Sequence, residues 1–184
     1  RSALPARSEM CIRDSTSTVN LANNFLIGSG GMALSGTNTI VLNGVISGVG
    51  GGRLTKNNGG ILRINGVNTY AGGTTLNGGT TVVSKDEAFG TGVIAIGSSG
   101  ARIDATGTVN LVNDIGLSAN GTFGGTGNLT LSGVISNTTS RTVAKVGSGQ
   151  LILANANTYQ GGTTLSGGTL VVGNNQALGS GGLT

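Results

Sequence analysis

Hydrophobic and polar residues alternate in short runs along most of the chain. Leu62 and Ile64 form one such run, and Leu151 and Leu153 another. Residues two apart lie on the same face of a β-strand, so each run predicts a strand with one buried side. The Gly, Ser and Asn residues between the runs favour tight turns. The pattern predicts many short strands joined by turns, and argues against a disordered Gly/Ser-rich linker.

The chain also repeats itself over a long distance. The block NTYAGGTTLNGGT at 68–80 returns as NTYQGGTTLSGGT at 157–169, an offset of 89 residues. The same offset relates Lys56 to Lys145. A solenoid coil has about 20–45 residues, so at roughly 22 residues a coil this period predicts about four coils. The whole chain then holds about eight coils, and the two blocks do not touch each other.

Each block is predicted to form strands separated by corners. An Asn-Thr pair turns the chain, a Gly-Gly pair makes the next corner, and a three-residue Thr-Thr-Leu strand follows before a second Gly-Gly corner. That succession describes one turn of a β-helix. The residues that we expect to carry this geometry are Asn68, Thr69, Tyr70, Gly72, Gly73, Gly78, Gly79, Asn157, Thr158, Tyr159, Gly161, Gly162, Gly167 and Gly168.

Two segments are distinguished by composition. Residues 1–15 hold the only proline and the only cysteine and contain no glycine, in a chain with 37 glycines among 184 residues. Their string EMCIRDS resembles translated sequencing-adapter read-through, so 1–15 are predicted to be non-native or unstructured, the alternative being a genuine cap or linker. Residues 16–184 are predicted to be one β-helix with a truncated second repeat.

The blocks and their flanks resemble a known family. The pattern GxLxLxxxNTYxGGTTLxGGTLxV followed by ALGxG is similar to the autotransporter-associated β-strand repeat, also called the passenger-associated transport repeat. The match covers Gly149–Gly181 and Gly60–Gly92, with Thr81 where Leu is usual. We expect this substitution to loosen its coil slightly.

The resemblance implies an all-β, right-handed parallel β-helix from an autotransporter passenger. Such passengers are secreted by the type V route of Gram-negative bacteria and cross the outer membrane through a C-terminal β-barrel translocator of the same polypeptide. The implied partner is that barrel, outside this segment, and the implied location is the cell surface or the extracellular space. This segment contains no apolar run of about 18 residues, so we do not expect it to insert into the membrane itself.

Composition narrows the function further. Charged residues are 9% and aromatic residues 3% of the chain, and the net charge of +4 is spread thinly. The chain has no basic cluster with interleaved aromatic residues, so we do not expect it to bind nucleic acid. The single Cys11 and the absence of histidine leave no metal cluster and no Ser-His-Asp arrangement. We expect no cofactor, no metal and no catalytic residue.

For the other candidate motifs, a structural interpretation is better supported than a functional one. Asp86 and Glu87 form the only close acidic pair outside residues 1–15, and we assign them to a solvated turn because Asn175 and Gln176 replace them in the second copy. The glycine-rich strings lack the Lys-Ser/Thr ending of a phosphate loop. Calcium-binding β-rolls need GGxGxD nonapeptides, and no Asp occupies that slot. Ice-binding solenoids need a threonine array on every coil, whereas the pairs Thr74-Thr75 and Thr163-Thr164 recur only after 89 residues. Tyr70 and Tyr159 are predicted to pack over the corners, with carbohydrate stacking as the alternative.

These observations predict a structural stalk that supports passenger folding and translocation and displays other modules. Two alternatives stay open. The coils could be an adhesin that binds host glycan or protein or self-associates, and a polysaccharide-cleaving β-helix enzyme is the third and least supported hypothesis.

Overall fold

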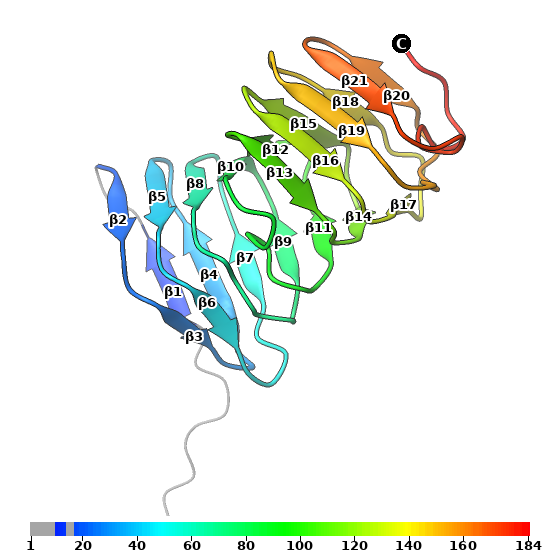
Figure 1. Ribbon diagram of the computed structural model, residues 1–184. Coiled ribbons are helices and arrows are strands. Elements are labelled where there is room, and N and C mark those ends of the chain that lie inside the picture. Colours follow the sequence, from blue (N-terminus) through cyan, green and yellow to red (C-terminus); the bar gives the residue numbers. More distant parts are fainter. Residues whose placement is uncertain (1–9, 14–16) are drawn as a thin grey trace, which may run out of the picture.

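The computed structural model describes residues 10–13 and 17–184. Over these residues the chain forms short strands and turns and no helix, and every strand pairs with its neighbours in parallel (Figure 1). No helix in this part of the chain could therefore span a membrane.

The strands stack on three faces of a solenoid. The first face carries seven strands, in the order β1 (Met10–Arg13), β4 (Met32–Ser35), β7 (Leu54–Lys56), β9 (Thr74–Leu76), β11 (Ile94–Ile96), β14 (Ile115–Leu117) and β17 (Ile135–Asn137). The second face carries eight, namely β2 (Val19–Leu21), β5 (Thr39–Leu42), β8 (Ile61–Ile64), β10 (Gly79–Val83), β12 (Ala101–Ala105), β15 (Gly121–Gly125), β18 (Val143–Lys145) and β20 (Thr163–Leu165).

The third face is interrupted. It begins with β3 (Phe25–Ile27) and β6 (Ile46–Gly48) and resumes with β13 (Thr108–Leu111), β16 (Asn128–Leu131), β19 (Gln150–Leu153) and β21 (Thr169–Val172). Between β6 and β13 the face is made by two segments without regular strands, 68–70 and 88–91. The backbone still connects them, because Thr69 N–H donates to Ile46 O and Thr91 N–H donates to Tyr70 O.

Successive coils lie in register. Met10 pairs with Met32, Met32 with Leu54 and Leu54 with Thr74, so the chain returns to the same face once in every coil. The fold is a parallel β-solenoid of about eight turns, and the predicted all-β, parallel β-helix class is confirmed.

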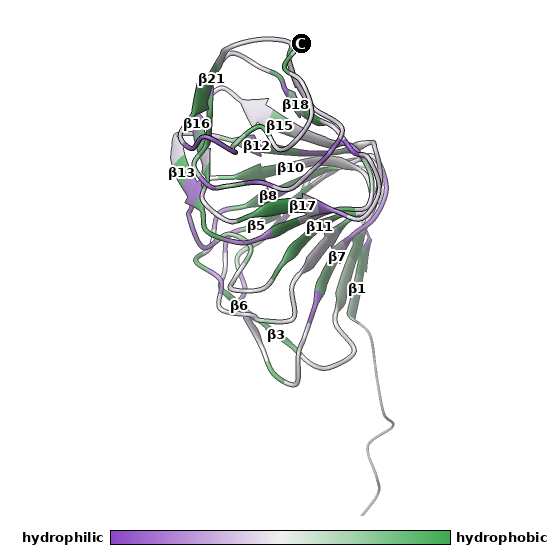
Figure 2. Cartoon of the chain, turned by 90° about the vertical axis from the view of Figure 1, so that its right-hand side faces the viewer, coloured by the Kyte–Doolittle hydropathy of each residue, from purple (hydrophilic) through white to green (hydrophobic). Residues whose placement is uncertain are grey.

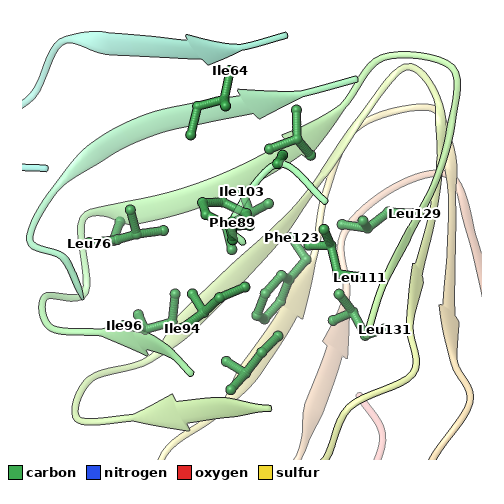
Figure 3. Packing of buried hydrophobic residues seen from close by; sticks show 14 of the residues in the cluster. Ile64, Leu76, Phe89, Ile94, Ile96, Ile103, Leu111, Phe123, Leu129 and Leu131 are labelled. Carbon is green, nitrogen blue, oxygen red and sulfur yellow. The ribbon is translucent and has the colours of Figure 1, made fainter. Parts of the chain in front are cut away.

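A narrow apolar core fills the solenoid from end to end. Inward residues of the strands are almost wholly aliphatic and stack on equivalent residues of the coil above and below, as Ile94 does on Ile115. Figure 3 shows Ile64, Leu76, Ile96, Ile103 and other side chains meeting in this interior, with Phe89 and Phe123 among them. Figure 2, turned by 90°, shows the strands of successive coils ranged around this common interior. Leu62, Ile64, Leu151 and Leu153 are buried as their alternation predicts, whereas in the last strand Leu170 is half-buried and Val172 is exposed.

The long repeat does not return to the same face. Strand β9 is the fourth strand of the first face, whereas its repeat equivalent β20 is the eighth strand of the second face. One repeat thus spans four coils and one further face, or four and one third coils, and the second copy is rotated by one face around the solenoid axis. The sequence estimate of about four coils lacked this extra third, and with it the rotation.

Part of the segment 1–15 contributes to the fold. Met10–Arg13 forms β1 and pairs along its length with β4, from Met10 with Met32 to Arg13 with Ser35. The expectation of an unstructured segment does not hold for these four residues. The rest of it, 1–9 and 14–15, lies outside the described residues, and a non-native origin of 1–15 stays a prediction.

Candidate functional site

The asparagine that opens each block joins three successive coils. Asn68 Oδ1 accepts a hydrogen bond from Ile46 N–H at 2.7 Å in the coil below, and Asn68 Nδ2 donates to Ala88 O at 2.6 Å in the coil above. Asn157 makes the same two bonds, with Ile135 N–H at 2.7 Å and Ala177 O at 2.7 Å. Both side chains are buried, so their amides replace strand hydrogen bonds where the chain turns the corner.

A buried lysine stands at the equivalent corner of each copy. Lys145 is fully buried, and its Nζ donates to the carbonyl oxygens of Val146 at 2.7 Å, Gly147 at 3.0 Å and Gly167 at 3.0 Å. Lys56 is 3% exposed and donates to Asn58 O at 3.0 Å and Gly78 O at 2.9 Å. An ammonium group has three donors and no acceptor, and these carbonyl oxygens accept from it.

The paired glycines of the block let neighbouring coils approach these corners. A β-carbon at Gly72 would lie 2.1 Å from Gly51 O, and one at Gly161 would lie 2.4 Å from the carbonyl carbon of Arg141. At Gly168, where φ is +68°, it would also lie 2.7 Å from Lys145 Nζ. Side chains in these places would push the coils apart or displace the lysine, so the glycine spacing is a packing requirement.

Both tyrosines of the block point into the core. Tyr70 and Tyr159 are fully buried, and each hydroxyl forms a hydrogen bond with the threonine four residues later, Thr74 and Thr163 respectively. Burial raises the pKa of both phenols above the usual range. The rings cover the corners from inside, and no exposed ring of the block is offered for stacking on a sugar.

Thr81 is a defect in the first copy. It is fully buried in register between Leu62 and Ile103, and its Oγ1 has no hydrogen-bond partner in the part of the chain that the structure describes. A buried hydroxyl without a partner destabilises a fold. Leu170 takes this position in the second copy, which gives the expected loosening at Thr81 a physical cause.

The described surface carries one acidic hollow, of about 400 Å³, where the third face is interrupted. The segment after β10 supplies Asp86 and Glu87, and the turn between β13 and β14 supplies Asp114 from the next coil. Figure 1 shows the segment that follows β10 crossing the stack close to β13. We refer to this site as the acidic hollow. Its lining is Asp86, Glu87, Gly90, Thr91, Gly92, Val93, Asn110, Val112, Asn113 and Asp114.

Backbone contacts hold the carboxylates in place. Asp86 Oδ1 accepts from Asn110 N–H at 2.8 Å, and Asp114 Oδ1 accepts from Val134 N–H at 2.8 Å. The fourth carboxylate of residues 16–184, Asp104, lies elsewhere and forms an ion pair with Arg102 at 2.6 Å. No three His, Cys, Asp or Glu side chains of residues 10–13 and 17–184 are placed to hold a metal ion.

Sequence reasoning missed both the burial of Lys56 and Lys145 among carbonyl oxygens and the acidic hollow. A signal for the lysines was present, because Lys56 follows Leu54 at the next-but-one position and so shares its inward face. For the hollow there was none: Asp114 comes more than a full coil after Asp86, and only the coil length and the interrupted third face bring the two together. The assignment of Asp86 and Glu87 to a turn fits their position, since both are exposed between β10 and β11.

Comparison with known proteins agrees with the repeat. The passenger-associated-transport-repeat family matches residues 54–83 and 143–172, the segments from β7 to β10 and from β18 to β21. The chain is also 33% identical over 133 residues, 71% of its length, to the adhesin BmaC autotransporter of Brucella suis biovar 1. It spans only 4% of that relative. No solved structure is significantly similar.

The two family matches fall on equivalent strands that differ only in the face they occupy. They contain the asparagine, lysine and glycine contacts that join the coils. The chain is a repeat protein of the autotransporter-passenger type, built on two copies of the passenger-associated transport repeat.

Proposed function

We propose that this chain is a stalk segment of a type V secreted surface protein, which supports passenger folding and translocation and displays other modules. The observation that carries this proposal is the use of the repeat residues. Four buried polar side chains of the repeat each form at least one hydrogen bond to a neighbouring coil, namely Asn68, Asn157, Lys56 and Lys145. A motif whose side chains face inward serves the stacking of coils and offers little to a ligand.

The same contacts suggest how the segment assists secretion. Each coil of a solenoid contacts only its neighbours, so folding can propagate from one coil to the next. Each repeat asparagine bonds the coil below and the coil above, so a newly emerged coil gains buried hydrogen bonds when it stacks on a folded one. We propose a non-enzymatic role at the outer-membrane surface, with the C-terminal translocator of the same polypeptide as partner.

The experiment is a surface-display assay. The chain is inserted between an N-terminal epitope and an autotransporter barrel in a Gram-negative host, and exposed epitope is measured with antibody on intact cells. We expect the Asn157→Ala variant to reduce exposure, and the exposed-site variant Asn43→Ala to leave it unchanged. Equal exposure with all three chains, or with the chain deleted, would rule out a contribution to translocation.

A second candidate is adhesion, which the similarity to an adhesin autotransporter favours. The similarity concerns a small part of that protein, so adhesion of this segment itself needs a direct test. A glycan array and a host-cell binding assay with the purified chain separate the two functions. Saturable binding supports adhesion, and a blank in both assays leaves the stalk role alone.

A further inference from the structure

The geometry points to the acidic hollow as a binding site for a lysine or arginine side chain that a partner protein presents. This inference goes beyond the stalk role and does not depend on it. Three carboxylates from two coils line it, those of Asp86, Glu87 and Asp114. The one ion pair formed among residues 10–13 and 17–184 is that of Arg102 with Asp104, so none of these three acids is paired with a cation of the described residues.

The carboxylates are positioned and still have oxygens available. Asp86 and Asp114 each use Oδ1 to accept one backbone N–H. Their second oxygens make no hydrogen bond within the described part of the chain, and Glu87 is exposed. On a chain with a net charge of +4, this site is a local concentration of negative charge that favours a cation.

The hollow also offers apolar surface. Val93 is 53% exposed and Val112 is 67% exposed, and both line it. A small metal ion or a bare ammonium ion gains nothing from two valines. Lysine and arginine carry an apolar stem that packs on such surface while the charged end reaches the carboxylates.

A buried amide gives an independent indication of the ligand. Asn113 lines the hollow and is only 4% exposed, and its Nδ2 donates to Gly90 O at 3.0 Å and Gly92 O at 2.8 Å. Its Oδ1 is itself buried and has no hydrogen-bond partner among the described residues, so a ligand would reach it by displacing part of the wall of the hollow. A buried acceptor without a donor is costly, and ammonium and guanidinium groups carry donors only. The carboxylates, the exposed valines and the unpaired amide oxygen are thus all complementary to a lysine or arginine side chain.

The second copy supplies matched substitutions. Asn175 and Gln176 stand at the positions of Asp86 and Glu87, so the repeat tolerates the neutral pair. The double variant Asp86→Asn/Glu87→Gln removes two charges with little change in shape. An asparagine Oδ1 at position 86 still accepts from Asn110 N–H. Asp104→Asn, which removes a carboxylate away from the hollow, is the control.

The experiment is an amide NMR titration of the isotope-labelled chain with Nα-acetyl-L-arginine amide. The matched probe is the citrulline analogue, which has the same shape and no charge. We expect saturable shifts at Gly90, Gly92, Asn110 and Asn113 with a Kd on the order of 1 mM. The double variant should bind at least about tenfold more weakly, Asp104→Asn should bind unchanged, and citrulline should give no saturation.

Three outcomes would overturn the inference. The first is an absence of saturable shifts with the arginine probe. The second is shifts that spread over the surface and persist in the double variant, which would reflect non-specific charge attraction. The third is saturation of the same amides by calcium chloride and not by the arginine probe, which would make the hollow a cation site. The amide spectrum of each variant also reports whether it is folded.

Discussion

The ammonium group of Lys145 donates a hydrogen bond to the carbonyl oxygen of Gly167, which lies 22 residues later in the neighbouring coil, at 3.0 Å. The bond crosses from one coil to the next at a corner, where the regular strand pairing stops. Lys56 makes the equivalent bond to Gly78 O at 2.9 Å. A long polar side chain thus continues the ladder of hydrogen bonds between strands.

We first predict that Lys145→Met destabilises the chain. Methionine fills a similar volume but donates no hydrogen bond, so three partly buried carbonyl oxygens lose this partner. The expected loss is about 1–3 kcal/mol in the free energy of unfolding, measured by urea denaturation. Lys85→Met, at an exposed position after β10, is the control. Replacing a buried charge by an apolar residue is stabilising in some proteins. A gain in stability here would show that the three hydrogen bonds from Lys145 Nζ to carbonyl oxygens do not stabilise the fold.

The second prediction concerns the asparagine that joins three coils. Asn157→Ala leaves the buried Ile135 N–H without its side-chain partner, at a cost of about 1–3 kcal/mol, and removes one of the two side-chain donors to Ala177 O, the other being the Tyr159 hydroxyl at 3.4 Å. Amide hydrogen exchange should show the loss locally, because Ile135 N–H is freed. Protection at Ile135 equal to that in the unchanged chain would show that another group replaces the amide.

Thr81 provides a prediction of the opposite sign. Thr81→Val keeps the branched shape and removes the hydroxyl that has no partner, so it should raise the free energy of unfolding by about 1–2 kcal/mol. The denaturation midpoint measures this gain. Thr164→Val, at a partly exposed threonine whose hydroxyl bonds that of Thr184, is the comparison and should bring no gain. No gain at Thr81 would indicate an unseen partner for its Oγ1.

Alkaline pH should unfold the chain through its tyrosines. Burial raises the pKa of Tyr70 and Tyr159 above the ordinary value of 10.0. Above pH 10 the unfolded chain releases these protons while the folded chain retains them, so stability falls by about 1.4 kcal/mol per pH unit for each phenol. Burial lowers the pKa of Lys145, which has the opposite effect: stability rises with pH up to the ordinary value of 10.5 and is constant above it.

Near-ultraviolet absorbance of tyrosinate and circular dichroism, recorded across the same pH range, check this prediction. The two signals should change together, because ionisation requires unfolding. The Tyr70→Phe/Tyr159→Phe variant should be less stable at pH 7, having lost two hydrogen bonds, but should show a smaller fall above pH 10. Tyrosinate formation in a chain with an unchanged dichroism spectrum would show that the phenols reach solvent without unfolding.

The sequence predicted those features that depend on local periodicity. Residues Leu151 and Leu153 alternate as strand residues do, and both are fully buried in β19. The sequence could not predict the features that depend on the exact length of each coil. The repeat is not a whole number of coils, so the rotation of the second copy emerged only from strand order. The acidic hollow depends on the same stacking, which brings Asp114 beside a segment of the preceding coil.

The rotation of the repeat places equivalent residues of the two copies at different corners. Asn77 and Ser166 are such a pair, and both are exposed. Leu76 stands in the first-face register that continues through Ile96 and Leu117 to Asn137. Thr158 N–H bonds Ile135 O, which places Gln160 above Asn77 at the same corner. Ser166 follows the second-face strand β20 and therefore lies at the next corner.

Spin labels at these positions give the last prediction. Labels at 77 and 160 should be separated by about four strand spacings, roughly 19 Å, apart from the label arms. Labels at 77 and 166 should be farther apart, because they are separated by a face as well as along the axis. Both pairs are made in a Cys11→Ser background and measured by pulsed electron spin resonance. If the pair at 77 and 166 gave the shorter distance, successive repeats would share one face and the rotation would be wrong.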